Sequence, residues 1–559
     1  MSNATKHGIR LGGRRVKWDF WSTITLVAIL FAIMFICYPF LYLFQNALTD
    51  KEGHLTLEHV LKFFRKNYYM VCLTNTLKLA FWATILATLV GLPLAYISTR
   101  YNTYAKGFTQ ILIVISLMSP PFIGAYAWVL LMGNNGILTN WAASIGWNLE
   151  PIYGFKGMLM VFVLKLYPYV YLYAQGALQK IDSSLEEASE SLGVHGFQRM
   201  MKVTFPVIMP TILNSMLMVF MTSIADYGTP MMLGKNYKVL TVAVYEEFMS
   251  EMVGDTSFAS ALAVMITLCT LLILIIQKTS IASKSYQMSA LRPPKEREFH
   301  GFKRVLVSSP LYFVGIIGIL PILVIVYTSF RAVKGTRFTD GFSLVSYQAV
   351  LDNMGRYIKN TFVMSAIAIV IVMIIGLLAA YLIVRRKSKI SSLLDLLLMF
   401  PYVIPGSVIG ISMVVAFNRR PLILTGTFFI IIMAYVIRKL PFTLRSSVGI
   451  LYQIDPSIEE ASISLGVPPS KTFFMTTAPQ MLPGLFSGAI LSFIEIINEL
   501  SCSMILYTGK TQTIAVAIFN SLFRDAYGTA AALATILTVV TVLALMLFNK
   551  LTGGKGYVS

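Results

Sequence analysis

A segment of fourteen residues occurs twice in this chain, and the duplication constrains the fold more than any other feature of the sequence. The copies are IDSSLEEASESLGV at 181–194 and IDPSIEEASISLGV at 454–467, and eleven of their fourteen positions are identical. Both copies are polar, and each is followed by two prolines at equal distances. A polar segment repeated almost unchanged predicts two equivalent surfaces, because loops without a binding role usually diverge.

The duplication extends beyond this polar segment. Residues 75–100 match residues 360–385 at a distance of 285 residues, whereas the polar copies are 273 residues apart. The first half therefore holds 12 additional residues, the difference between these two distances, and we expect them in the loop around 133–155. The identical positions in the first copy of this second match are Asn75, Thr76, Gly91, Leu92, Ala95, Tyr96 and Arg100.

Long apolar runs separate the repeated motifs. The chain is 56% hydrophobic and 13% charged, with a mean hydropathy of +0.72, which is typical of a protein that crosses a membrane many times. About 20 apolar residues span a bilayer, and a helix satisfies its own backbone hydrogen bonds there. The sequence predicts an all-α polytopic protein with twelve transmembrane helices. These predicted spans are 21–45, 75–99, 111–132, 157–178, 206–227, 258–277, 308–329, 360–384, 393–416, 422–444, 484–506 and 529–548.

The twelve spans form two halves of six, so both halves have the same orientation and constitute a parallel repeat. With the N-terminus inside, 25 of the 45 Lys and Arg residues fall in cytoplasmic segments, which places both termini and both polar copies in the cytoplasm. The predicted organisation is a tail at 1–20, a first six-helix repeat at 21–277, a linker at 278–304, a second six-helix repeat at 305–550 and a tail at 551–559.

Each polar copy has the signals of a short helix. Asp182 and Asp455 stand at the start, where a carboxylate caps the first turn, and acidic residues follow in that turn. Gly193 and Gly466 stand at the end, where a glycine allows the left-handed residue that stops a helix. The sequence therefore predicts two short helices outside the bilayer, each at a sharp turn before the next span.

The pattern Glu-Ala-Ser followed by glycine, with prolines opening the next span, resembles the EAA loop of ABC importer membrane subunits. In that family the loop forms a coupling helix that sits in a cleft of a cytoplasmic ATPase. The resemblance implies a first EAA loop at 181–205 and a second EAA loop at 454–478. The docking residues expected from it are Glu186, Glu187, Ala188 and Gly193 in the first loop, and Glu459, Glu460, Ala461 and Gly466 in the second.

The same resemblance implies where the protein is located and which partners it has. Most relatives are two separate six-span chains, and this chain is similar to a fused pair of the type I importer fold. We expect a bacterial inner membrane location, two copies of an ABC ATPase as partners, and an external or periplasmic substrate-binding protein. The chain itself is expected to bind no cofactor and no nucleic acid and to be no enzyme, with ATP and Mg²⁺ bound by the ATPase subunits.

Two segments bear on the substrate. Residues 221–234 resemble the end of the fifth span in ferric-iron permeases, and residues 492–506 resemble the second-half counterpart, with Glu499–Leu500 matching a common pair. Tyr227 replaces the usual Phe, and Ser501 stands where Pro is frequent. The resemblance thus favours ferric iron, while phosphonate, sugar-phosphate and thiamine importers share much of the pattern and remain alternatives.

Ionisable residues within the spans are candidates for a substrate pathway. Asp226 and Glu499 occupy the same repeat position, and Glu495 lies one helical turn before Glu499. Carboxylate and phenolate oxygens suit a hard cation, although these acids could instead cap helix ends or form ion pairs. No residue is firmly assigned as a metal ligand. A run of tyrosines in the fourth span adds further oxygens, or serves packing alone: Tyr167, Tyr169, Tyr171 and Tyr173.

Lys165 and Arg438 are a second pair of equivalent positions, each three residues before a proline. They could attract an anionic substrate, or they could neutralise Asp226 and Glu499. The 6 + 6 arrangement also occurs in ion-coupled secondary transporters, which are the alternative class of function. Their major family usually carries a charged Gly-Asp-Arg type loop after the second span, and residues 99–107 read TRYNTYAKG instead.

Overall fold

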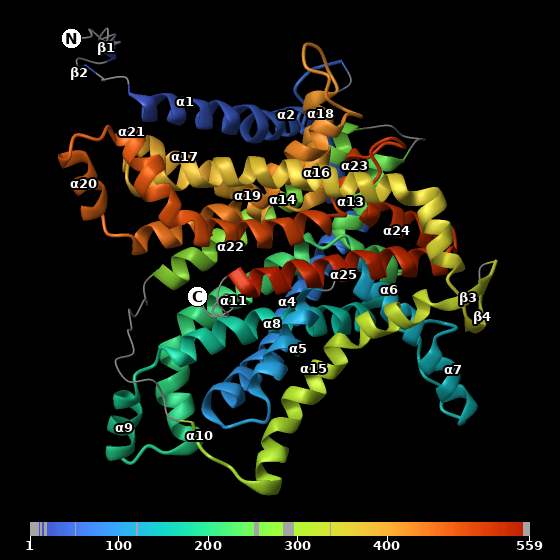
Figure 1. The fold of residues 1–559 in the computed structure, drawn as a ribbon. Helices are drawn as coiled ribbons and strands as arrows, with labels where there is room; N and C mark the ends of the chain where they lie inside the picture. Colours follow the sequence, from blue (N-terminus) through green and yellow to red (C-terminus); the bar gives the residue numbers. More distant parts are fainter. Residues whose placement is uncertain are drawn as a thin grey trace.

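The computed structural model describes residues 10–11, 14–15, 19–50, 52–118, 121–250, 256–282, 296–335 and 337–551. Much of the two predicted tails and of the linker lies outside these described residues. Within them the protein is almost entirely helical (Figure 1).

The first half, with the short strands that precede it, consists of β1 (Arg10–Leu11), β2 (Arg14–Arg15), α1 (Phe20–Ala32), η1 (Ile33–Cys37), α2 (Tyr38–Ala47), α3 (Glu58–Arg65), α4 (Asn67–Arg100), α5 (Lys106–Met118), α6 (Pro121–Met132), α7 (Ile137–Ser144), α8 (Gly154–Gln179), α9 (Ser183–Ser191), α10 (Gly196–Arg199), η2 (Met200–Thr204), α11 (Phe205–Ala225), α12 (Gly228–Leu233), α13 (Leu240–Met249) and α14 (Thr256–Ala282).

The second half consists of α15 (Gly301–Ser329), β3 (Arg331–Lys334), β4 (Arg337–Phe342), α16 (Val345–Val384), α17 (Lys389–Met399), η3 (Phe400–Val403), α18 (Gly406–Phe417), α19 (Phe428–Gln453), α20 (Ser457–Ser464), α21 (Pro469–Thr472), η4 (Phe473–Thr477), α22 (Ala478–Ile497), α23 (Ser503–Leu506), α24 (Ile514–Phe523) and α25 (Tyr527–Leu551). Strands β3 and β4 form an antiparallel hairpin.

In the part of the chain that the structure describes, ten helical segments are long and apolar enough to cross a membrane. An eleventh is the bent pair Lys389–Val403 and Gly406–Phe417, whose two parts meet at 112°. The twelfth expected span corresponds to α19, a 26-residue helix whose interior carries Arg438 and Lys439 and which packs against α16 and α22. Twelve predicted spans are consistent with this architecture.

Several predicted spans differ in detail from the observed helices, and the span predicted at 111–132 comprises two helices, α5 and α6. The span predicted at 393–416 is not continuous, because Pro401 and Pro405 interrupt it between α17 and α18. The span predicted at 422–444 begins before the observed helix and ends before it, since α19 begins at Phe428 and continues to Gln453. The span predicted at 484–506 begins after the start of the observed helix and extends beyond its end, since α22 covers Ala478–Ile497. The chain then turns into the short helix α23.

The two halves exchange their outer helices. One apolar core combines α16 to α19 of the second half with α1, α2 and α14 of the first half. The other core combines α4 to α8 and α11 of the first half with α15 and α25 of the second half. In Figure 1 the blue α2 accordingly lies beside the orange α18, and the yellow-green α15 lies beside the blue α5. Neither half is a separate packing unit.

The centre of each half is a tight contact between its second and fourth long helices. A Cβ atom added at Gly91 of α4 would lie 2.6 Å from the carbonyl oxygen of Tyr167 on α8. The equivalent Gly376 of α16 lies against Thr443 of α19, where an added Cβ would be 3.0 Å from Cγ2. Glycine at both positions lets the helix backbones approach closely, as small residues do in membrane helix packing.

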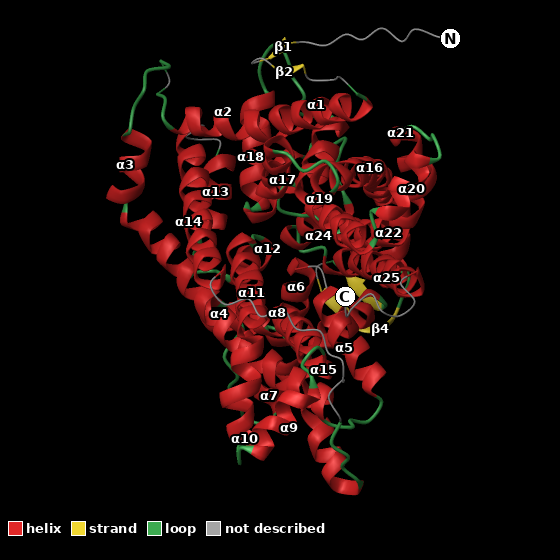
Figure 2. Ribbon diagram, turned by 90° about the vertical axis from the view of Figure 1, so that its left-hand side faces the viewer, coloured by secondary structure: helices red, strands yellow, loops and turns green. Residues whose placement is uncertain are grey.

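Both EAA loops lie at one end of the helix bundle. In Figure 1, α9, α10, α20 and α21 are at the left, whereas α7 and the β3–β4 hairpin are at the right. Figure 2 looks onto the left-hand end and shows α9 and α10 well separated from α20 and α21. The repeated polar segments therefore present two separate surfaces on the same face of the molecule.

Candidate functional site: the two EAA loops and the interior charges

The two EAA loops have the same backbone design. The carboxylate of Asp182 accepts a hydrogen bond from the Ser184 backbone N–H at 2.9 Å, which caps α9. Asp455 accepts from Ser457 at 2.9 Å in the same way, and this backbone hydrogen bond lowers the pKa of its carboxyl. Both predicted helices are present. Asp182 is the N-cap residue of α9, whereas the N-cap residue of α20 is Pro456, directly after Asp455.

The two glycines end these helices as the sequence predicts. Gly193 has φ = +78° and Gly466 has φ = +85°, the left-handed region that other residues avoid. The backbone N–H of Val194 donates to the Ser189 carbonyl at 2.9 Å, and that of Val467 donates to Ser462 at 3.2 Å. This pairing closes the last turn of a helix on its own carbonyls.

The outward face of each loop carries part of the predicted docking set. Glu187 and Glu460 are exposed, and so are the neighbouring alanines and both glycines. Leu192 is 82% exposed and the equivalent Leu465 is 85% exposed. The same large apolar side chain is thus exposed at the same position of both copies.

Glu459 points the other way. Its side chain is buried and accepts hydrogen bonds from the Tyr381 hydroxyl and from Arg385 Nε, both at 3.0 Å. Arg385 also donates to the carbonyl of Ile454 at 2.7 Å. Glu459 therefore ties α20 to the end of α16 within the chain, and the side chain of the equivalent Glu186 lies outside the described residues.

Sequence reasoning missed this anchor, although its signal was available. Tyr381 and Arg385 repeat Tyr96 and Arg100 of the first half, and these were among the seven identical positions of the longer match. Arg100 is only 4% exposed, so a buried cation stands at the corresponding place in the first half as well.

A matched pair of π-helical turns joins the EAA loops to the fifth long helices. η2 (Met200–Thr204) and η4 (Phe473–Thr477) are separated by the same 273 residues as the polar copies. In each, a backbone N–H donates to a carbonyl five residues earlier, from Phe205 to Met200 and from Ala478 to Phe473. Prolines 206 and 479 follow at once and cannot donate a hydrogen bond, which favours such a shifted turn.

Deeper in the bundle, the predicted cation and acid of the first half form an ion pair. Lys165 Nζ on α8 lies 2.9 Å from Asp226 Oδ2, and both side chains are nearly buried, at 13% and 4% exposed. Asp226 also accepts hydrogen bonds from the backbone N–H and the hydroxyl of Thr229, at 3.0 and 3.1 Å, and Thr229 lies in the first turn of the short helix α12.

The second half repeats this arrangement. Arg438 Nη1 on α19 lies 2.5 Å from Glu499 Oε1, and the backbone N–H of Cys502 donates to the same carboxylate at 3.2 Å. From the sequence, each cation and each acid could be a pathway group or a neutralising partner. In the structure, the cation and the acid of each half form an ion pair with each other. Since each acid also accepts a backbone hydrogen bond from the start of the short helix that follows, the pair fixes the turn at the end of the fifth long helix.

The second half has one further ion pair that breaks the symmetry. Lys439 Nζ lies 2.9 Å from Glu495 Oε2 and 3.2 Å from Glu499 Oε2. The equivalent positions in the first half are Leu166 and Thr222, neither of which carries a charge. Glu495 remains 44% exposed at its side chain, whereas Lys439 is 6% exposed, so the carboxylate is the accessible member.

Glu495 lies where the two halves meet. Tyr169 of α8 and Tyr402 of η3 both lie near its carboxylate. The Tyr402 hydroxyl also contacts Met218 Sδ of α11 at 2.8 Å. Of the four tyrosines in the fourth span, Tyr169 and Tyr173 are partly exposed. The other two, Tyr167 and Tyr171, are fully buried, as packing groups are.

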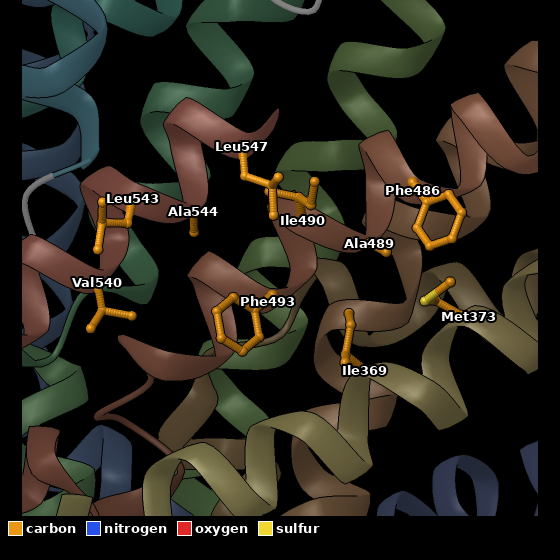
Figure 3. A pocket seen from close by; sticks show the side chains of 10 residues that line it. All are labelled: Ile369, Met373, Phe486, Ala489, Ile490, Phe493, Val540, Leu543, Ala544 and Leu547. Atoms are coloured by element: carbon orange, nitrogen blue, oxygen red, sulfur yellow. The ribbon is translucent and has the colours of Figure 1, made fainter. Parts of the chain in front are cut away.

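A cavity of about 400 Å³ between α16, α22 and α25 offers no polar site (Figure 3). Apolar side chains alone line it, so it holds no ligand for an ion. Within the described residues, no group of three or more His, Cys, Asp and Glu side chains is placed to hold a metal ion. The lining residues of the cavity are Ile369, Met373, Phe486, Ala489, Ile490, Phe493, Val540, Leu543, Ala544 and Leu547.

Duplicated six-helix halves, each with an exposed capped helix between its fourth and fifth long helices, define a membrane permease built as a fused repeat. Residues 87–286 and 372–552 match the family described as binding-protein-dependent transport system inner membrane component, and the chain belongs to this family. It is therefore an ABC importer permease and a multi-span protein of the bacterial inner membrane. It acts as a transport subunit rather than an enzyme, and the alternative of an ion-coupled secondary transporter is set aside.

Individual relatives cover nearly the whole chain. The ferric transport system permease protein FbpB of Actinobacillus pleuropneumoniae is 29% identical over 544 residues, which are 94% of this chain and 78% of the relative. The Fe(3+)-transport system permease protein FbpB 2 of Haemophilus influenzae is 26% identical, over 95% of this chain and 98% of the relative. Among solved structures, a chain of a bacterial ABC transporter involved in the import of alginate is similar at a TM-score of 0.41 and 17% identity, over 47% of this chain and 95% of that chain.

Proposed function

We propose that this permease imports ferric iron. The observation that supports the proposal most is the similarity to ferric transport permeases along both halves, rather than along one half or one motif. In this proposal an external binding protein delivers the iron to the end of the bundle that carries α7 and the β3–β4 hairpin. Both termini and both EAA loops then lie in the cytoplasm, in keeping with the bias of Lys and Arg.

Two copies of a cytoplasmic ABC ATPase supply the energy in this proposal. They bind ATP and Mg²⁺, and the permease binds neither. The docking surfaces are the exposed faces of the two EAA loops, with Glu187 and Leu192 on the first and Glu460 and Leu465 on the second. When ATP brings the two ATPases together, the two loops approach each other and the bundle changes from inward-open to outward-open.

The proposed path of the iron runs past Glu495. This carboxylate is the accessible acid among the interior charges, and phenols of both halves lie near it. Oxygen donors of this kind suit a hard trivalent cation. Asp226 and Glu499 are less suited, because each is already bound to a cation and to a helix start.

Uptake measurements test the substrate. Cells that carry the complete system are expected to accumulate radioactive ferric iron in a manner that depends on this chain and on ATP. Phosphonate, sugar phosphate and thiamine serve as comparison substrates in the same cells. Uptake of one of these without uptake of iron would overturn the ferric proposal while leaving the class of transporter intact.

The pathway role of Glu495 has a matched test. Glu495→Gln is expected to lower iron uptake about tenfold or more, because the substitution removes the charge that attracts the cation. The control is Thr222→Val at the equivalent position of the first half, which carries no charge and should leave uptake near the wild-type level. Equal uptake by both variants at equal expression would remove Glu495 from the path.

The docking role is tested by Gly193→Asp together with Gly466→Asp. Both glycines have positive φ, and an added Cβ at either meets no atom within 4 Å, so the strain stays local to the loop. The double variant is expected to be a folded membrane protein that no longer retains the ATPase on purification. Normal recovery of the ATPase with this variant would contradict docking at the EAA loops.

A further inference from the structure

The second EAA loop is connected to the first helix of the chain through a continuous set of contacts. Trp21, at the start of α1, is 2% exposed and stacks on Tyr381 with ring centroids 4.2 Å apart. The Tyr381 hydroxyl donates to Glu459 of α20 at 3.0 Å. Both rings also meet the edge of Phe473, at 4.9 and 4.7 Å, and Phe473 is the first residue of the π turn η4.

An ion pair holds the same end of α1 in place. Asp19 caps α1 by accepting from the Ser22 backbone N–H at 2.8 Å, and its other carboxylate oxygen lies 3.0 Å from Arg386. Arg386 directly follows Arg385, the residue that binds Glu459. The start of α1 is therefore fixed to the same turn of chain that anchors α20.

The other end of this helical segment contacts elements of both halves. Asn46 near the end of α2 donates to Ser260 of α14 at 3.0 Å. Phe35 packs against Phe417, the last residue of α18, with centroids 5.9 Å apart. The helical segment that begins at Trp21 is thus in contact with α14 of the first half and with α18 of the second half.

Tyr96, the first-half equivalent of Tyr381, has different neighbours. Tyr96 meets Tyr101 edge-on at 6.2 Å, and Tyr101 stacks on Phe299, which precedes α15, at 5.2 Å. Arg304 of α15 donates to the carbonyls of Asn102 and Thr103, at 2.8 and 3.2 Å. In the first half, an arginine of α15 thus contacts the loop after α4, whereas in the second half a tryptophan of α1 stacks on Tyr381.

We propose that Trp21, Tyr381, Arg385 and Glu459 are positioning residues that convert movement of the second EAA loop into movement of α1 and α2. The proposal rests on ATPase docking at the EAA loops and adds a defined route into the membrane helices. Glu459 belongs to this internal route rather than to the surface that touches the ATPase. Without the route, the ATPase still docks and still hydrolyses ATP, but hydrolysis no longer drives transport efficiently.

The test compares three quantities in purified complexes reconstituted with the binding protein: recovery of the ATPase, ATP hydrolysis, and iron transported per ATP hydrolysed. Glu459→Gln and Trp21→Ala are expected to retain the ATPase while lowering iron transported per ATP about tenfold, the effect of losing a charge-assisted hydrogen bond or a buried aromatic contact. Trp21→Phe, which keeps a ring against Tyr381, should recover much of the wild-type ratio.

Two further variants keep the outcome decisive. Tyr381→Phe removes only the hydroxyl that binds Glu459 and should lower the same ratio even if Trp21→Ala fails to fold. Val27→Ala is the control on α1, since Val27 is 58% exposed, and it should behave as wild type. If Glu459→Gln loses the ATPase while Glu460→Gln keeps it, Glu459 is a docking residue and the inference is overturned, although docking itself stands.

An unchanged ratio of iron to ATP in Glu459→Gln and Tyr381→Phe would also overturn the inference. Failure of the underlying proposal gives a different result, because the wild-type chain would then not retain the ATPase at all.

Discussion

Lys165 and Asp226 show why a charge inside a membrane protein is rarely informative by itself. Each is nearly buried, and each lies 2.9 Å from the other. Removing one partner from such a pair leaves an uncompensated charge, which costs about 3–5 kcal/mol, whereas removing both is often nearly neutral. The same pairing makes Lys165 and Arg438 poor candidates for attracting an anionic substrate.

The two ion pairs are expected to respond unequally to substitution. Lys165→Met should lower the thermal stability of the detergent-solubilised protein more than Arg438→Met does, because Lys439 remains 3.2 Å from Glu499 and can compensate that acid. In the first half, Leu166 stands at the position of Lys439, so this position supplies no second cation to compensate Asp226.

Adding Asp226→Asn to Lys165→Met should recover most of the lost stability. The midpoint of thermal unfolding measures both effects. Equal losses in Lys165→Met and Arg438→Met would show that Lys439 does not compensate Glu499.

Among the helices, the contact between the second and fourth long helices of each half depends on a single glycine. At Gly91 the obstacle to a side chain is backbone, since an added Cβ would lie 2.6 Å from the Tyr167 carbonyl oxygen. At Gly376 the obstacle is the methyl group of Thr443 at 3.0 Å, which can move by a few tenths of an ångström. The repeat thus preserves the residue but not the tightness of the contact.

Gly91→Ala is therefore expected to be more damaging than Gly376→Ala. Separating two helix backbones in a packed core costs about 1–3 kcal/mol, and the first variant requires that separation while the second requires only a side-chain adjustment. The yield of monodisperse protein after solubilisation and the unfolding midpoint should both be lower for Gly91→Ala. The reverse order would mean that the α16–α19 contact is the stiffer of the two.

For the whole molecule, the exchange of outer helices makes the two halves interdependent. Each apolar core needs helices from the other half, so a half expressed alone exposes the surfaces that α1, α2 and α14, or α15 and α25, normally cover. The fused chain ensures that both sets of helices are present in equal amounts.

Dividing the chain between residues 290 and 291 tests this interdependence. Co-expression of the two parts is expected to give a complex that purifies through a tag on either part, because the exchanged helices reassemble the two cores. Each part expressed alone should aggregate or be degraded. Recovery of one part alone as a stable, monodisperse protein would contradict the exchange.

Much of this architecture could be predicted from the sequence, and the reasons for the limits are physical. The repeat, the helical class and the capped ends of α9 and α20 depend on local signals, such as Asp455 and Gly466, and the structure has them where predicted. The partner of Glu459 depends on which helix end lies opposite α20, and the exchange of α1 and α15 depends on packing between halves. A span count carries no information on either.

A second limit explains the errors in the spans. Pro401 and Pro405 indicate a break that an apolar window hides, and Thr427, whose side chain caps α19 by accepting from the Ile430 backbone N–H, marks a start six residues later than the predicted one. In both cases the signal is local, but an average over an apolar window does not register it.

The π turns η2 and η4 affect how each EAA loop is rotated about the axis of the helix that follows it. Each accommodates one residue more than an α-helical turn at the junction between an EAA loop and the helix that follows it. One residue corresponds to about 100° of rotation around a helix axis. Deleting a residue from Met200–Thr204 or Phe473–Thr477 would restore regular α-helix and turn the loop by about that angle relative to α11 or α22. The extra residue thus sets the direction in which each EAA loop faces, independently of which residues the loop contains.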